Sequence, residues 1–201
     1  KLDNVTTARF DASDEAATFS ALKDISCDIA VLNAGTCEYV DIDEIEPDMF
    51  KRVFSINVFG SINVASALIP NLQRGSKLIF VDSMARLLPF TRSQAYGASK
   101  AAIHYACKSF EVDLKHKGIK VQSMSPGFVE TPLTEKNDFS MPMSISAEKA
   151  AKYMLKGLQS DNSSIYFPRR FGFIMRCLSL LPERLQRKIC VKMRSENTSS
   201  T

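Results

Sequence analysis

Three side chains in one short stretch have the types and the spacing that proton transfer requires. Ser83 precedes Tyr96 by thirteen residues, and Lys100 follows Tyr96 by four. Residues four apart on a helix project from the same side, so the phenol and the ammonium are expected to lie together. A free phenol has a pKa of about 10, and a neighbouring cation lowers it. The Ser83 hydroxyl could supply a second hydrogen bond to a substrate oxygen. The alternative is that Tyr96 and Lys100 are an ordinary pair on the surface of a helix, with no catalytic role.

The elements around these residues follow from the apolar pattern. Residues 77–82 form an apolar run rich in branched side chains, which predicts a buried strand that ends just before Ser83. A helical pattern starts near Ser93, and its apolar face repeats at intervals of four, three and four in Ile103, Cys107, Phe110 and Leu114. Tyr96 and Lys100 therefore belong to the first turns of a helix that follows the strand.

The rest of the chain alternates between strand patterns and helix patterns. This alternation predicts an α/β fold with a parallel sheet. Strands are expected at residues 4–10, 27–32, 77–82, 119–125 and 164–167. Helices are expected from about Ser13 and at residues 47–69, 93–117 and 146–159.

Unusual residues follow several of these strands directly. Asn33-Ala34-Gly35, Ser83 and Pro126-Gly127 each stand at the carboxyl end of a predicted strand. Ligands bind at that edge of open parallel sheets, so the residues predict a binding site there. Asn57 lies on the apolar stripe of helix 47–69, where a buried amide needs hydrogen-bond partners. It belongs either to the site or to helix packing.

The segment Tyr96-Gly-Ala-Ser-Lys100-Ala-Ala, with Ser83 upstream, resembles the active-site signature of the short-chain dehydrogenase/reductase superfamily. The resemblance implies a Rossmann-like, doubly wound parallel sheet. It also implies reversible hydride transfer between NAD or NADP and a carbonyl or secondary alcohol. Tyr96 would be the general acid/base and Ser83 the donor to the substrate oxygen. Lys100 would lower the pKa of Tyr96 and bind the nicotinamide ribose, and Asn57, within an Asn-Val-x-Gly segment, would position a relay water.

Other segments resemble the cofactor-binding parts of the same family. Asp11, after Phe10, matches the residue that meets the adenine amino group, and Asn33-Ala34-Gly35 matches the segment beside the adenosine ribose, although Leu32 replaces its first Asn. The segment Pro126-Gly127-Phe128-Val129-Glu130-Thr131 resembles the loop that contacts the nicotinamide in this family. The implied cofactor-binding residues are Asp11, Asn33, Ala34, Gly35, Tyr96, Lys100, Pro126, Gly127, Val129 and Thr131. The choice between NAD and NADP is not readable from them.

The resemblance covers residues 5–167 and leaves out the start of the family fold. No Thr-Gly-x-x-x-Gly-x-Gly turn is present among the eight glycines. By comparison with the family pattern, we expect about 50 residues, the size of two strand–helix units, to be missing. We therefore expect strand 4–10 to lack a neighbour and strand 27–32 to be an exposed apolar edge. We interpret the sequence as an incomplete enzyme that is inactive alone. The alternative is a non-catalytic binding or scaffold protein that cannot hold a dinucleotide.

Composition limits the remaining possibilities. The chain has 201 residues, of which 45% are hydrophobic and 24% charged, as expected for one soluble domain. No uninterrupted apolar run reaches the 18 residues of a membrane helix. Five cysteines without CxxC spacing and only two histidines predict no metal site and a reducing compartment, the cytoplasm.

Positive charge is concentrated in the last part of the chain. Residues 162–201 carry eight Lys/Arg and two Glu, so we separate a domain, 1–167, from a basic tail, 168–201. The tail is a basic amphipathic pattern that fits a membrane surface or, alternatively, a lid over the cleft or an oligomer interface. No nucleic-acid motif accompanies it. Small residues in helices 47–69 and 93–117, together with the resemblance, predict a homo-oligomer.

Overall fold

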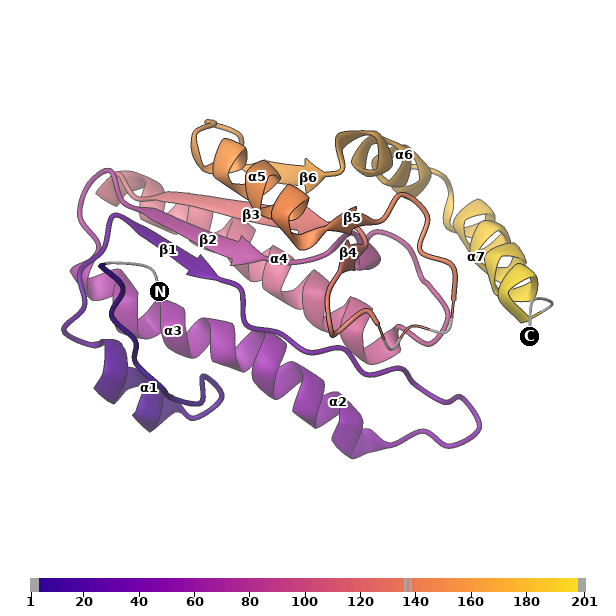
Figure 1. Ribbon diagram of the computed structural model, residues 1–201, viewed down its shortest axis with the longest axis horizontal. Helices are drawn as coiled ribbons and strands as arrows, with labels where there is room; N and C mark the ends of the chain where they lie inside the picture. The colour runs from indigo at the N-terminus through magenta and orange to yellow at the C-terminus, as the bar shows by residue number, and fades with distance from the viewer. Residues whose placement is uncertain (1–3, 136, 138, 199–201) are drawn as a thin grey trace.

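The computed structural model of the chain describes residues 4–135, 137 and 139–198. Its main sheet has four parallel strands in the order β1-β2-β3-β6. The strands are β1 (Ile29–Leu32), β2 (Lys77–Val81), β3 (Lys120–Pro126) and β6 (Ser164–Phe167). Figure 1 shows them side by side, with their carboxyl ends at the same edge. The predicted α/β fold with a parallel sheet is confirmed.

Helices cover both faces of this sheet (Figure 1). On one face lie α1 (Glu15–Leu22), α4 (Gln94–Leu114) and a long helix built of α2 (Pro47–Phe54), a π segment (Ser55–Gly60) and α3 (Ser61–Leu68). On the other face lies α5 (Ala147–Leu158). A parallel sheet covered on both sides buries every strand residue in its middle, which explains the uninterrupted apolar run of β2.

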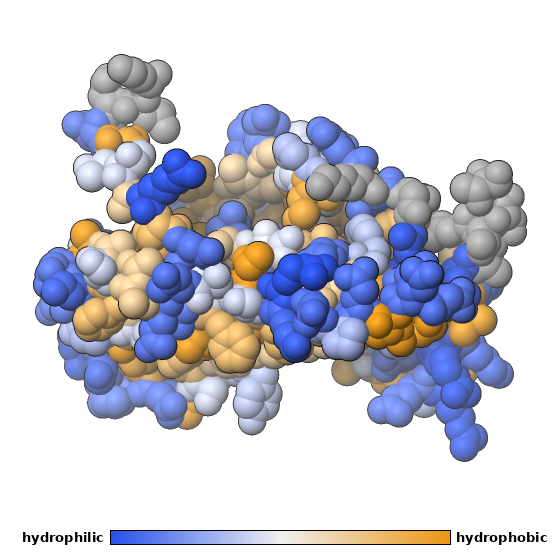
Figure 2. Space-filling model, turned by 90° about the horizontal axis from the view of Figure 1, so that it is seen from below, coloured by the Kyte–Doolittle hydropathy of each residue, from blue (hydrophilic) through white to orange (hydrophobic). Residues whose placement is uncertain are grey.

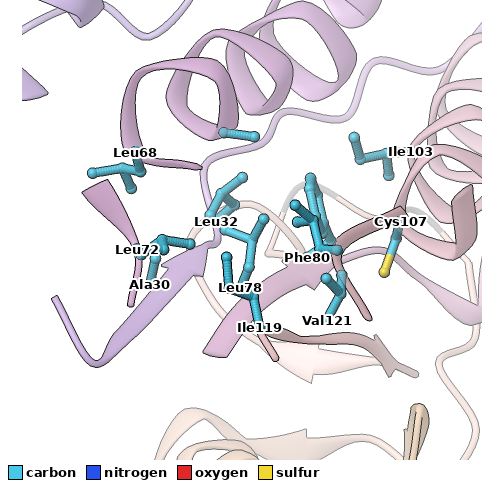
Figure 3. Packing of buried hydrophobic residues seen from close by; sticks show 12 residues of the cluster. Ala30, Leu32, Leu68, Leu72, Leu78, Phe80, Ile103, Cys107, Ile119 and Val121 are labelled. Carbon is cyan, nitrogen blue, oxygen red and sulfur yellow. The ribbon is translucent and has the colours of Figure 1, made fainter. Parts of the chain in front are cut away.

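The larger core lies between the sheet and helices α3 and α4. Figure 3 shows Leu78 and Phe80 of β2 at its centre, with Ile103 and Cys107 approaching from α4. Phe80 is fully buried and stacks on Phe110 with ring centroids 5.7 Å apart. Ile79 of the same strand points to the opposite face, where α5 packs.

The beginning of the chain differs from the prediction. Residues 4–10 form no strand, and Val5 is 58% exposed. A strand requires the backbone of a neighbour for its hydrogen bonds, and within the described residues no strand pairs with this segment. β1 is the edge strand of the sheet. The edge of β1 is therefore open, with Ile29 and Val31 44% and 42% exposed, and the predicted apolar edge is confirmed.

Three smaller features were not predicted. Helix 47–69 contains the π segment Ser55–Gly60, and a short two-stranded sheet of β4 (Val129–Glu130) and β5 (Ile145–Ser146) stands in the polar stretch before α5. Short 3-10 turns cover Ile69–Asn71, Met84–Arg86 and Lys115–Lys117. α4 ends at Leu114 and continues into the 3-10 turn Lys115–Lys117, which stops at Gly118, whose φ of +70° suits glycine.

The tail forms two helices, α6 (Arg169–Ser179) and α7 (Glu183–Thr198). They pack on the loop after β2 through a core cluster of Met84, Leu88, Met175 and Cys190. The segment Pro47–Asn71 is long and apolar enough by composition to span a membrane. In this fold its Ala65 and Leu68 pack against the sheet, as the core helix of a domain does.

Candidate active site

The carboxyl end of β2 and the start of α4 bring the three predicted residues together. Ser83 follows β2 and caps the turn Met84–Arg86, where its hydroxyl accepts a hydrogen bond of 3.1 Å from the Ala85 N–H. Lys100 is buried, and its Nζ donates to the Val81 carbonyl at 3.0 Å. This Nζ lies 5.8 Å from the centroid of the Tyr96 ring. A serine hydroxyl, a phenol and an ammonium therefore share one edge of the sheet.

Burial controls the protonation of this group. It raises the pKa of Tyr96 to about 12, although a hydrogen bond with Ser83 opposes the rise. It lowers the pKa of Lys100 to about 8, against the charge of Asp82, which favours the protonated form. The group that lowers the pKa of Tyr96 here is thus Ser83, whereas the sequence pointed to Lys100. At neutral pH the phenol is protonated and can act as an acid.

Asn57 lies in the π segment with its amide buried. Its Oδ1 accepts from the Thr36 N–H at 2.7 Å, and its Nδ2 donates to the Thr36 carbonyl and to Ser99 Oγ, both at 2.9 Å. The amide therefore ties the segment after β1 to α4. This geometry fits the helix-packing alternative, and a role in holding a relay water stays a prediction.

Gly35 leaves space beside Lys100. A Cβ built on it would lie 3.2 Å from Lys100 Nζ and 3.3 Å from Asn57 Oδ1. Asn33, Ala34 and Gly35 are exposed at the carboxyl end of β1, next to the ammonium. A side chain at Gly35 would therefore fill the space beside Lys100 Nζ and Asn57 Oδ1.

The segment Pro126–Thr131 continues β3 at the same edge. The Gly127 N–H donates to the Phe167 carbonyl at 2.8 Å, and a Cβ on Gly127 would meet the Phe171 ring of α6 at 2.7 Å. Val129 lies in β4, and the Thr131 N–H donates to Thr134 Oγ1 at 3.0 Å. The segment is therefore pinned between β6 and the tail.

Asp11 stands apart from these residues in its contacts. Its Oδ1 accepts from the N–H and the hydroxyl of Ser13, at 2.9 and 2.8 Å, and these bonds lower the pKa of its carboxyl. The next residue, Ala12, accepts a hydrogen bond of 3.0 Å from Asn63 of α3. Asp11 is therefore an exposed carboxylate held against α3.

Sequence reasoning missed a buried polar cluster beneath the site. Asp82 Oδ2 accepts from Arg86 Nε at 2.8 Å and lies 2.6 Å from His104 Nδ1. Arg86 also donates to the Tyr166 hydroxyl at 2.9 Å. The signal was present, because Asp82 directly precedes Ser83 and His104 follows Lys100 by one helical turn.

The chain is similar to known proteins. The sequence matches the short chain dehydrogenase family over residues 2–140. The chain belongs to this family.

Individual relatives are similar over part of their length. The chain is 29% identical over 160 residues to an uncharacterized oxidoreductase of Myxococcus xanthus, covering 79% of this chain and 63% of that protein. A Staphylococcus epidermidis oxidoreductase is 33% identical over 133 residues, covering 65% of this chain and 58% of the relative. The chain thus spans about three fifths of the length of these relatives.

Solved structures show the same fold. A short chain dehydrogenase from Burkholderia cenocepacia, crystallised with NADP, superposes with a TM-score of 0.80 at 20% identity, covering 95% of this chain and 81% of that one. A gluconate 5-dehydrogenase from the same organism, in complex with NADP and tartrate, is 28% identical with a TM-score of 0.58, covering 62% and 52%.

Proposed function

We propose that this chain carries the catalytic residues of an NAD- or NADP-dependent oxidoreductase that interconverts a carbonyl and a secondary alcohol. The observation that carries the proposal is the buried Lys100 beside Tyr96 and Ser83 at the carboxyl edge of a parallel sheet. The names of the relatives, which are oxidoreductases, support it. The two Burkholderia cenocepacia structures with NADP support the choice of cofactor class.

The proposed chemistry follows from the protonation of the site. A bound nicotinamide cofactor supplies the hydride for the carbonyl carbon. Tyr96, protonated at neutral pH, donates its proton to the carbonyl oxygen, so the product is an alcohol. Ser83 donates a hydrogen bond to the same oxygen, and Lys100 would bind the nicotinamide ribose. In the reverse direction the tyrosinate accepts the alcohol proton.

The chain fits the nicotinamide half of such a cofactor. The gap at Gly35 opens toward Lys100 Nζ, and Asn33 and Ala34 are exposed beside it. The nicotinamide would contact the segment containing Pro126, Gly127, Val129 and Thr131, which is fixed by β6. Asp11 would accept a hydrogen bond from the adenine amino group. Neither NAD nor NADP is favoured by these residues.

The rival proposal is a binding or scaffold protein of the same fold. The sequence feature that favours it is the lack of a Gly-rich turn, which supplies backbone donors for a pyrophosphate. Binding of NADPH and NADH, measured by calorimetry on the protein at its full natural length, separates the two. Binding together with turnover of a carbonyl panel supports the enzyme, and binding of neither cofactor supports the scaffold.

We also propose that the protein is a homo-oligomer joined through its long helices. Tyr105 and Val112 of α4 are 78% and 74% exposed, and Phe59 of the π segment is 59% exposed. Figure 2, which looks onto the side where α1, α2 and α3 lie, shows apolar groups between charged ones. Light scattering tests this. A dimer or tetramer that Tyr105→Glu dissociates supports it, and a monomer at micromolar concentration overturns it.

We propose further that the protein is cytoplasmic and that its tail contacts a membrane surface. Phe173 of α6 and Leu180, directly after this helix, are 69% and 85% exposed, and Arg169, Arg170 and Arg176 belong to the same helix as Phe173. Exposed apolar groups beside cations fit an anionic lipid surface. Co-sedimentation with anionic vesicles, lost on Phe173→Glu and weakened by salt, supports this. Absence of binding at low salt leaves the tail as a lid or interface element, consistent with the packing of Cys190 on the loop after β2.

A further inference from the structure

A carboxylate lies buried directly behind the proposed catalytic serine. The side chain of Asp82 has no exposed surface, and its Oδ2 accepts from Arg86 Nε and lies within hydrogen-bond distance of His104 Nδ1. Its backbone N–H donates to the Met124 carbonyl of β3 at 2.9 Å. The backbone of Asp82 is therefore fixed by the sheet, and its side chain is fixed by Arg86 and His104.

The other carboxylate oxygen is unusual. Asp82 Oδ1 is buried and accepts no hydrogen bond within the part of the chain that the structure describes. Buried polar atoms nearly always have a partner, because a buried oxygen without one costs free energy. Each such exception needs an explanation, and a role in catalysis is one of the recognised explanations. The neighbours of Asp82 are residues of the proposed active site.

The backbone connects Asp82 to both catalytic side chains. Ser83 follows it in sequence, and Lys100 Nζ donates to the carbonyl of Val81, which precedes it. Three consecutive residues thus carry the three groups: Val81 the carbonyl that accepts from Lys100, Asp82 the carboxylate and Ser83 the hydroxyl. A movement of the Asp82 side chain would shift both contacts.

We propose that Asp82 is a positioning residue of the reaction: its buried carboxylate fixes the segment that holds Ser83 and Lys100 and supplies the negative charge that faces Lys100 and Tyr96. This inference rests on the proposed oxidoreductase function. Arg86 extends the anchorage, because it reaches from Asp82 to the Tyr166 hydroxyl of β6. Arg176 of α6 covers the Tyr166 ring at 5.1 Å, so the tail takes part in the same support.

The charge acts on both titrating groups in the same direction. Asp82 raises the pKa of Lys100 against burial, and it also raises the pKa of Tyr96. It therefore favours a cationic lysine and a protonated phenol, which is the state that gives a proton to a carbonyl. Cys37 faces the same two groups with the same effect, whereas Arg86 and His104 hold Asp82 from the side of the turn and of α4.

The test uses the 201-residue chain and needs no turnover. Lysine labelled with ¹³C at Cε is titrated by NMR, and Lys100→Arg assigns the signal. In the parent, Lys100 titrates near pH 8, well below the ordinary 10.5. Asp82→Asn keeps the shape of the side chain but removes its charge, so the midpoint should fall by about one pH unit, a tenfold change in the acid equilibrium.

His104→Gln is the matched control, because it alters one partner of Asp82 but leaves the carboxylate charged. It should move the Lys100 midpoint by much less than Asp82→Asn does. If Asp82→Asn does not fold, the Asp82 ¹³Cγ signal of the parent is followed instead, and its chemical shift should change at the Lys100 midpoint. An unchanged midpoint in folded Asp82→Asn, or no such change in the parent, overturns the proposal.

The same variants separate this inference from the proposed function. In the protein at its full natural length, Asp82→Asn should shift the alkaline limb of kcat/KM to lower pH, with His104→Gln much closer to the parent. A uniform loss of activity without a shift would indicate a purely structural role and overturns the electrostatic part. If the parent reduces no carbonyl but the NMR midpoints move as stated, the proposed function fails and the coupling of Asp82 to Lys100 stands.

Discussion

Replacing the buried lysine by methionine should stabilise the folded chain at neutral pH. Lys100 is 5% exposed, and burial lowers its pKa from 10.5 to about 8. A difference of about 2.5 pH units corresponds to about 3 kcal/mol at 1.36 kcal/mol per unit. Methionine avoids this cost but leaves the Val81 carbonyl without its donor, which costs about 1 kcal/mol. The net gain of Lys100→Met at pH 7 is therefore about 2 kcal/mol.

The gain should depend on pH in a defined direction. Below pH 8 the lysine is charged in the folded and the unfolded chain, so the full cost is present. Between pH 8 and 10.5 the folded chain loses the proton first, the unfolded chain binds more protons, and the stability of the parent rises with pH. Above pH 10.5 the cost is gone. The advantage of Lys100→Met should therefore shrink across this interval and become a disadvantage of about 1 kcal/mol, because neutral Lys100 still donates to the Val81 carbonyl.

The assay is thermal unfolding of both proteins in buffers from pH 7 to pH 10.5. At pH 7 the melting temperature of Lys100→Met should be about 4–8 °C higher, because 1 kcal/mol corresponds to about 2–4 °C for a chain of this size. Lys51→Met, at an exposed lysine paired with Asp48, is the control and should change the melting temperature by no more than about 2 °C. A Lys100→Met protein that is less stable at pH 7, or a difference that does not vary with pH, would refute the reasoning.

Three further predictions concern packing and the open edge. Phe80→Ala should lower the free energy of unfolding by about 3–5 kcal/mol in urea titrations, because it empties the centre of the core. Gly172→Ala should cost about 1–3 kcal/mol in the same assay, since its Cβ would lie 2.6 Å from Tyr166 Cβ and push α6 off β6. Val31→Lys should reduce aggregation of this chain, followed by light scattering at rising concentration, because a charge on the open strand opposes edge pairing; unchanged aggregation would mean that another surface drives it.

Local sequence patterns predicted most of the central fold, because each of these patterns fits only one kind of secondary structure. The apolar run at residues 77–82 is β2, and the four-three-four spacing after Ser93 is α4, the two elements that carry Ser83, Tyr96 and Lys100. The strand predicted at 4–10 failed because alternation describes a surface for pairing but does not supply the neighbour. The π segment at Ser55–Gly60 depends on one extra residue in a turn, which no periodicity reveals.

The buried residues that hold the site in place were harder to predict from the sequence than Ser83, Tyr96 and Lys100. Asp82 and His104 are 22 residues apart, and Arg86 and Tyr166 are 80 apart, so each pair is joined only by the fold. The amide of Asn57 likewise finds Thr36 and Ser99 across two element boundaries. Motif spacing brought Ser83, Tyr96 and Lys100 together, because they lie on one turn and one helix. It did not capture the residues that hold them from other strands.

The central claim is that Tyr96 donates the proton in a cofactor-dependent carbonyl reduction. The measurement that tests it most directly compares the parent with Tyr96→Phe in the protein at its full natural length, following the oxidation of NADPH or NADH with a carbonyl substrate that the parent reduces. Tyr96→Phe should lower kcat by about 10²–10⁴-fold, with the dissociation constant of the cofactor changed little. A Tyr96→Phe protein that keeps most of the parent kcat would contradict the account.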